Sequence, residues 1–320
     1  MSSAASCTTN ERHTDHPGEE HPGLPLPLVH RARREDAFVT GWQRAGAEGS
    51  FVVSGRWPAH HPFFPPVDGT YDPLLVAETM RQAGILIVHA GYAVPVGYQF
   101  LLSTFRYSCA TELLRVDAGP ADIDVLVQCS DIEWRKLRPQ SMRIAMTVRR
   151  GGNVVARGLF VAKFISPSIY VRLRGERAVP RTWVSDAVPV PPAPAGRTRA
   201  EDVVIAPAAE PGQWLLRVDT THPTLFQGRK DHVPGMLLFE AARQTAQVLH
   251  APSPFVPACG EIAFHRYAEF DSPCLIQAER LPSQGAVRVV GKQDGAPVFS
   301  SVFTERTAAA CVPVGAGQPA

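Results

Sequence analysis

The stretch Val-Pro-Gly-Met-Leu-Leu-Phe-Glu-Ala-Ala-Arg-Gln at residues 233–244 has a near copy at residues 71–82, Tyr-Asp-Pro-Leu-Leu-Val-Ala-Glu-Thr-Met-Arg-Gln. Glu, Arg and Gln recur at the same spacing, and the two glutamates, Glu78 and Glu240, stand 162 residues apart (240 − 78). Each copy begins at a proline-containing turn and continues into apolar sequence, so each predicts a buried helix with one carboxylate. A buried carboxylate is costly and needs either partners or a function.

The similarity between the two halves extends well beyond these helices. Other matched segments follow one another in the same order in both halves: 34–39 with 200–205, 51–53 with 214–216, 61–64 with 222–226, and 105–107 with 264–267. The spacing between copies changes by only a few residues, as loop insertions would cause. The period is far too long for a solenoid, so the chain is predicted to contain a duplicated domain.

Composition and charge exclude several classes of protein. The 320 residues are 45% hydrophobic with a formal net charge of +2, which fits two ordinary cores. No run of Lys and Arg indicates a nucleic-acid surface, although a local basic cluster could hold a phosphate. The longest uncharged stretch, between Arg81 and Arg106, is interrupted by Gly91, Pro95 and Gly97, which argues against a membrane span.

The ends of the chain and its cysteines favour a cytoplasmic protein. Residues 1–22 are polar and contain no apolar signal sequence. The six cysteines form no C-x-x-C pair, which favours buried, reduced thiols. The predicted organisation is a disordered tail, a first repeat, a Pro/Ala-rich linker, a second repeat and a second disordered tail, at residues 1–22, 23–178, 179–199, 200–306 and 307–320.

Each repeat has the pattern strand, strand, helix and then several strands. Residues 122–128 alternate polar and apolar side chains, as a half-buried strand does. Residues 142–149 and 154–163 flank a Gly-Gly-Asn turn and predict a hairpin, and residues 286–291 and 298–304 predict its counterpart. One long apolar helix and about five antiparallel strands favour a sheet that wraps around the helix, which is an α+β fold.

The segment 231–244 resembles the central helix of hotdog-fold β-hydroxyacyl-ACP dehydratases, in which a Pro-Gly turn opens the helix and a Glu follows on it. The whole chain more closely resembles the A-factor biosynthesis (AfsA-type) family, over residues 25–175 and 200–306. The resemblance implies two tandem hotdog domains packed as an intramolecular pseudo-dimer, each an antiparallel sheet wrapped around a central helix. It departs from the dehydratases at one point: their catalytic His, about fourteen residues before the Glu, is replaced by Phe226 and Phe64.

The same resemblance implies an acyltransferase in the biosynthesis of a γ-butyrolactone-type, butenolide or furan signalling molecule. Its substrates would be a β-ketoacyl group on acyl carrier protein and the hydroxyl of dihydroxyacetone phosphate, with no cofactor. No metal-ligand spacing and no nucleotide-binding motif is present in the sequence.

The chemistry of that reaction suggests roles for particular residues. A base must take the hydroxyl proton, for which Glu240 is the first candidate and His222 the alternative or partner. The backbone N–H groups of Gly235 and Met236 can bind the oxyanion. Gln244 shares a helix face with Glu240. The other candidates are the matched residues Glu78, Gln82 and His61 of the first repeat and the possible phosphate-binding cations Arg243, Arg229, Lys230 and Arg81.

The sequence leaves several alternatives open. Either glutamate could instead belong to a buried polar network with its Gln and Arg neighbours, and Glu78, whose turn lacks the Pro-Gly pair, could be vestigial. A thioesterase or dehydratase acting on similar thioesters, or a non-catalytic acyl- or lactone-binding regulatory protein, would also fit. Acyl-chain length, the final product, the number of active sites and the choice between monomer and homodimer are not determined by the sequence.

Overall fold

The computed structural model describes residues 23–282 and 285–305 of the chain. The tails predicted at 1–22 and 307–320 lie outside this part. The described residues contain two copies of one order of elements, strand–strand–helix followed by four strands, where the sequence predicted about five strands in all. The first copy comprises β1 (Val39–Arg44), β2 (Ser50–Trp57), α1 (Pro73–Leu86), β3 (Gln99–Cys109), β4 (Ala121–Arg135), β5 (Arg138–Arg150) and β6 (Asn153–Ile165). The second comprises β7 (Ile205–Pro207), β8 (Gln213–Leu216), α3 (Gly235–His250), β9 (Cys259–Phe264), β10 (Leu275–Arg280), β11 (Ala286–Gln293) and β12 (Ala296–Thr304).

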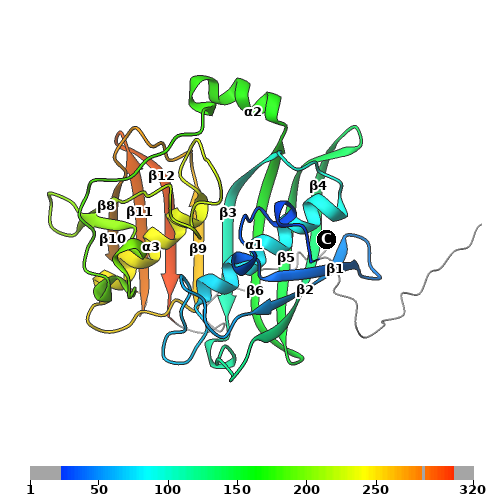
Figure 1. Cartoon of the computed structure of the whole chain (residues 1–320), viewed down its shortest axis with the longest axis horizontal. Helices are drawn as coiled ribbons and strands as arrows, with labels where there is room; N and C mark the ends of the chain where they lie inside the picture. Colours follow the sequence, from blue (N-terminus) through cyan, green and yellow to red (C-terminus); the bar gives the residue numbers. More distant parts are fainter. Residues whose placement is uncertain (1–22, 283–284, 306–320) are drawn as a thin grey trace, which may run out of the picture.

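All the strands belong to one antiparallel sheet of twelve, in the order β1-β2-β4-β5-β6-β3-β9-β12-β11-β10-β8-β7. Read outward from the β3–β9 pair, the order in one half repeats that of the other, so the halves are related by a pseudo-twofold axis at this junction (Figure 1). The prediction that the repeats pair edge to edge is therefore confirmed. The pairing removes two exposed strand edges.

The backbones at this junction approach closely. Tyr107 of β3 stands opposite Gly260 of β9, and a Cβ on Gly260 would come within 2.4 Å of the Tyr107 ring. Glycine is therefore required there for the ring to lie across the junction.

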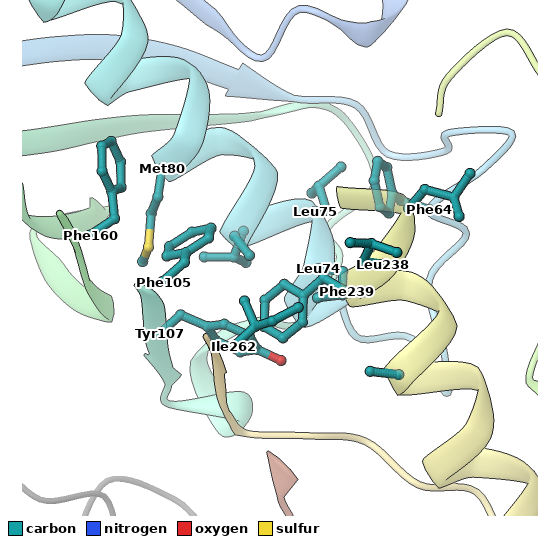
Figure 2. Packing of buried hydrophobic residues seen from close by; sticks show 14 of the residues in the cluster. Phe64, Leu74, Leu75, Met80, Phe105, Tyr107, Phe160, Leu238, Phe239 and Ile262 are labelled. Atoms are coloured by element: carbon teal, nitrogen blue, oxygen red, sulfur yellow. The ribbon is translucent and has the colours of Figure 1, made fainter. Parts of the chain in front are cut away.

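The two central helices meet in a shared core. Figure 2 shows Leu74 and Leu75 of α1 beside Leu238 and Phe239 of α3, with Phe105 of β3 to their left. The Phe239 ring is fully buried and lies 6.1 Å from Phe105 across the junction. Truncation of such a residue typically costs about 3–5 kcal/mol, so the interface is part of the folded core. The predicted interface between the two helix segments is confirmed, but the helices meet near their first turns instead of packing side by side along their lengths.

A short helix that the sequence did not predict, α2 (Pro167–Arg174), follows β6 and extends from the body of the molecule (Figure 1). The predicted hairpins are confirmed as β5–β6 and β11–β12. No helix within the described ranges is long and apolar enough to cross a membrane. Cys109, Cys129 and Cys274 are buried free thiols as predicted, but Cys259 is disulfide-bonded, so the prediction of reduced thiols is wrong at that position.

Candidate active site

The helix glutamate of the second repeat lies in a buried network of donors. Glu240 is fully buried, and Arg243 donates to both of its oxygens at 2.9 and 2.7 Å. Gln244 Nε2 donates to Oε1 at 2.6 Å, and Arg197 Nε donates to the same atom at 2.9 Å. Burial alone would raise the pKa of Glu240, but the two arginines lower it to about 2.

The first repeat has the same arrangement. Arg81 donates to both oxygens of Glu78 at 2.8 Å, and Gln82 donates to Oε1 at 2.8 Å. Arg31 forms an ion pair with the same carboxylate. Burial is again outweighed by the arginines, and the pKa of Glu78 is lowered to about 2. Each helix glutamate is therefore an ionised carboxylate that holds two arginines and a glutamine.

Gln82 and Gln244 also tie each helix to the segment before the first strand of its repeat. Gln82 accepts from Phe38 N at 2.8 Å and donates to Asp36 O at 2.7 Å. Gln244 accepts from Val204 N at 2.9 Å and donates to the backbone carbonyl of Asp202 at 2.8 Å. A side chain whose polar atoms are used in this way anchors the backbone.

The matched histidines are also held in structural contacts. His222 Nδ1 accepts from the backbone N–H groups of residues 224 and 225, and its Nε2 lies 3.1 Å from Asp202 Oδ1. His61 Nδ1 accepts from residues 63 and 64, and its Nε2 lies 3.3 Å from Asp36 Oδ1. An Nδ1 that accepts two backbone N–H groups carries no proton, so each ring is fixed in one tautomer with Nε2 facing its aspartate.

A cavity of about 680 Å³ lies between the repeats. Its lining combines apolar side chains with charged groups from both halves. The apolar residues include Phe63, Phe64, Leu74, Ile85, Phe100, Leu102, Phe105, Phe160, Leu225, Met236 and Phe264. The polar wall includes His30, Arg31, Glu78, Arg81, Arg229, Lys230, Asp231, His232, Gly235 and Glu240.

The charged wall carries more positive than negative charge. Arg31, Arg81 and Lys230 lie near one another, and burial followed by repulsion from these two arginines lowers the pKa of Lys230. Among the described residues, Lys230 has no carboxylate within ion-pair distance. The Nε of Arg31 is buried without a hydrogen-bond partner in the described part of the chain. Counted over the lining residues, four cations (Arg31, Arg81, Arg229 and Lys230) stand against three carboxylates (Glu78, Asp231 and Glu240), a formal excess of +1 (4 − 3).

The pseudo-symmetric position in the other half is smaller and formally neutral. A cavity of only about 170 Å³ lies beside Arg197 and Arg243. Asp72, at the start of α1, points toward it, with Oδ2 3.9 Å from Arg197 Nη1. Asp72 and Glu240 together balance the two arginines in formal charge. The first-repeat residue Asp72 therefore fills the position that is open on the other side.

The N-termini of α1 and α3 also differ: a side chain caps α1, whereas the start of α3 is open. Asp72 caps α1 by accepting from Leu74 N at 2.8 Å. Pro234 precedes α3, and no side chain of the described residues caps that end. Pro234, Gly235 and Met236 line the larger cavity. The first N–H groups of a helix have no intrahelical acceptor, so those of Gly235 and Met236 are available to a bound anion or carbonyl.

His30 adds a neutral group to the charged wall. Its Nε2 lies 2.9 Å from His89 Nε2, and His89 Nδ1 lies 2.6 Å from Val94 O. Burial and the nearby Arg81 lower the pKa of His30 to about 3, so the ring is uncharged at neutral pH. His30 has a left-handed backbone with φ of 53°, and the matched position in the second repeat is Gly196 with φ of 67°.

The structure therefore brings some of the sequence-predicted residues together and separates others. Glu78, Arg81, Arg229, Lys230, Gly235, Met236 and Glu240 line the larger cavity, whereas His61, Gln82, His222, Arg243 and Gln244 do not. Sequence reasoning missed Arg31 and Arg197, which bind the two glutamates. The signal was present as Arg-x-Arg-x-Glu-Asp at 31–36 and again at 197–202. Within the described ranges, no group of three or more His, Cys, Asp or Glu side chains could hold a metal ion.

The sequence matches a known protein family and several of its named members. The model of the A-factor biosynthesis hotdog domain matches residues 13–166 and 181–307. The chain is 50% identical over 292 residues to a 2-oxo-3-(phosphooxy)propyl 3-oxoalkanoate synthase of Streptomyces coelicolor, covering 89% of this chain and 93% of that one. It is 45% identical over 291 residues to a protein of the same name from Streptomyces virginiae, covering 89% and 98%.

Solved structures that align with the chain are more distant in sequence. A 12:0-ACP thioesterase from Umbellularia californica aligns with a TM-score of 0.47 and 11% identity over 80% of this chain and 97% of that one. An acyl-ACP thioesterase from Bacteroides thetaiotaomicron aligns with a TM-score of 0.47 and 13% identity over 79% and 97%.

Proposed function

The chain belongs to the A-factor biosynthesis hotdog family, and from that premise we propose that it catalyses the reaction in the name of its relatives. A 3-oxoacyl group is transferred from a thioester to the hydroxyl of dihydroxyacetone phosphate, giving the 2-oxo-3-(phosphooxy)propyl ester of a 3-oxoalkanoate. Such a product would serve as a precursor of a γ-butyrolactone-type signalling molecule.

The observation that carries this proposal is that the 680 Å³ cavity is lined both by apolar side chains and by a group of cations. A phosphate monoester has a charge of about −1.5 to −2 at pH 7. Arg31, Arg81 and Lys230, which lie near one another in the lining, offer positive charge to such a group. The pseudo-symmetric site is neutral and much smaller, so we propose a single active site, between the repeats.

The roles of the cations follow from their contacts. Glu78 orients Arg31 and Arg81 by accepting from both, so its proposed function is positioning. Arg81 and Lys230 then face the phosphate, with the exposed Arg229 at the edge of the site. Arginine can bind phosphate oxygens through two parallel hydrogen bonds, whereas lysine contributes a compact point charge.

The start of α3 suits the carbonyl that is attacked. The free N–H groups of Gly235 and Met236 would stabilise the oxyanion of the tetrahedral intermediate, supported by the helix dipole. The acyl chain would lie along the phenylalanine-rich wall, which includes Phe64 and Phe105. The acyl chain would fill the apolar part of the cavity and so keep water from the thioester.

Glu240 was the first candidate for the base, but its surroundings favour a structural role. Its carboxylate already accepts from two arginines and a glutamine, and a carboxylate with a pKa of about 2 is a weak proton acceptor at neutral pH. We therefore propose that Glu240, Arg243 and Arg197 form a buried ionic cluster that fixes the second repeat. Acyl carrier protein is the proposed donor, since its thioester would present the acyl chain at the mouth of the cavity.

The test of the proposed function is a product assay by mass spectrometry. The purified protein is incubated with a 3-oxoacyl thioester of acyl carrier protein and with dihydroxyacetone phosphate, or with dihydroxyacetone as the matched acceptor without phosphate. We expect the phosphorylated ester to form far faster than the unphosphorylated one. Release of free 3-oxo acid at one rate, with or without the phosphorylated acceptor, would instead identify a thioesterase.

A further inference from the structure

Transfer of an acyl group to a hydroxyl needs a base, and the glutamates and matched histidines are engaged elsewhere. Glu78 and Glu240 each hold two arginines. His61 and His222 use Nδ1 on backbone N–H groups, outside the cavity. A base must therefore come from another residue on the cavity wall.

His232 lies on that wall beside an aspartate. Its Nδ1 is 2.8 Å from Asp231 Oδ1, and its ring packs edge-on against Tyr267 with centroids 4.7 Å apart. An ionised carboxylate can only accept, so the proton of the neutral ring is on Nδ1 and the lone pair is on Nε2. No hydrogen-bond partner of Nε2 occurs among the described residues.

The aspartate is itself firmly held by α2. Tyr170 donates its hydroxyl to Asp231 Oδ2 at 2.6 Å, and Arg174 Nε donates to the same oxygen at 3.2 Å. Arg174 also binds Glu269 and stacks over the Tyr267 ring at 4.2 Å. Burial would raise the pKa of Asp231, but donors from His232 and Tyr170 lower it well below its ordinary range. The carboxylate is thus ionised and fixed in position.

The pair is next to the groups proposed to bind the carbonyl. The same loop continues from His232 through Pro234 into α3, and His232, Gly235 and Met236 all line the cavity. The corresponding residues of the first repeat are Gly69 and Thr70, which provide no acid or base. The Asp–His pair therefore occurs only in the half whose helix start is open to the cavity.

We propose that His232 is the general base of the acyl transfer and that Asp231 is its positioning residue, an inference that rests on the proposed function. Nε2 takes the proton from the acceptor hydroxyl as its oxygen attacks the thioester carbonyl and a C–O bond forms. The tetrahedral intermediate collapses, the C–S bond breaks, and the imidazolium returns the proton to the leaving thiolate. The ester and the free thiol are the products, and the enzyme is regenerated unchanged.

The decisive variant is His232→Ala, assayed by the steady-state rate of formation of the phosphorylated ester. We expect kcat to fall by about 10²- to 10⁴-fold. The KM for dihydroxyacetone phosphate should stay within about threefold, because the cation cluster is intact. Added imidazole should restore turnover, and more basic imidazoles should restore it further. The exposed His60, replaced by Ala, is the matched control.

Two further variants separate catalysis from folding. Asp231→Asn should lower kcat while imidazole gives no rescue, because the ring is present but poorly oriented. His232→Gln fills the space without a basic lone pair and replaces His232→Ala if that variant fails to fold. A loss of activity in His232→Gln with an unchanged thermal midpoint supports the proposal.

The two levels of the proposal fail in different ways. A wild-type protein that forms no ester under any of these conditions refutes the proposed function. A wild type that forms ester while folded His232→Ala or His232→Gln keeps its kcat within about threefold refutes the role of His232 alone. Lost activity that imidazole does not restore in folded His232→Ala would also refute it.

Discussion

Replacing Lys230 with Ala should weaken binding of the phosphorylated acceptor without affecting the acyl donor. Lys230 is half-buried beside Arg31 and Arg81 and has no carboxylate partner in the described part of the chain. A hydrogen bond to a charged group contributes about 1.5–3 kcal/mol. At about 1.4 kcal/mol per tenfold change, the KM for dihydroxyacetone phosphate should rise about 10- to 150-fold.

The assay is the initial rate of ester formation as the acceptor is varied at saturating thioester. The KM for the thioester should stay within about twofold, because the apolar wall is unchanged. Lys163→Ala, at an exposed position on β6 away from the cavity, is the control. Lys230→Arg should retain much of the affinity since it keeps the charge.

A second acceptor makes the test specific to the phosphate. With dihydroxyacetone, which lacks the phosphate, wild type and Lys230→Ala should have nearly equal kcat/KM, because the missing interaction is absent in both. If Lys230→Ala raises the KM for dihydroxyacetone phosphate no more than Lys163→Ala does, the phosphate does not bind at this cluster.

Three further predictions concern other buried ionisable groups. Glu240→Gln should lower the free energy of unfolding by about 3–5 kcal/mol in urea titrations, because it leaves buried arginines without a balancing charge. Turnover per folded molecule should be retained. The control Glu279→Gln, in an exposed pair with Arg288, should change the free energy of unfolding by less than about 1 kcal/mol. Because burial lowers the folded pKa of His30 to about 3 from 6.5, its contribution to stability is present above pH 6.5 and is lost toward pH 3. At about 1.4 kcal/mol per pH unit, the loss at pH 5 is about 2 kcal/mol, and thermal melts of His30→Asn should show a correspondingly weaker pH dependence. Asp72→Ala should lower the stability by about 1 kcal/mol through the loss of helix capping, and it should expose Arg197 and Arg243. Calorimetric titration with inorganic phosphate should therefore detect two binding sites in the variant and one in the wild type. A single site in the variant would contradict the role given to Asp72.

The elements that the sequence predicted correctly are those with a strong local pattern. The helices at 73–86 and 235–250 follow apolar runs that begin at proline turns, and both hairpins follow alternation around glycine turns. The edge-to-edge pairing of the two repeats was predicted from their shared order of strands and helix. Short-range patterns were sufficient to predict these elements because each pattern occurs in both repeats.

The charged site was harder to predict, because it depends on which residues meet after folding. Arg31 and Arg197 stand in short, charge-rich segments that look exposed in sequence, and only the closure of the chain over each helix buries them. Arg197 falls in the segment predicted to be a linker. Gly235 was expected to act with Glu240 of its own helix, and the cavity that both residues line also contains Arg31 and Arg81 of the other repeat.

The pseudo-twofold junction at β3 and β9 has a consequence for how the site could evolve. In a dimer of identical chains, every substitution is made in both copies, so an Asp at the start of the helix would close both sites. A Gly at the position of His30 would likewise remove that histidine from both. Joining the copies in one chain allows each side to change alone. One site could then be closed by Asp72 and lose its histidine at Gly196. The other could acquire Lys230, Asp231 and His232, so that a nearly symmetric fold has a single asymmetric active site.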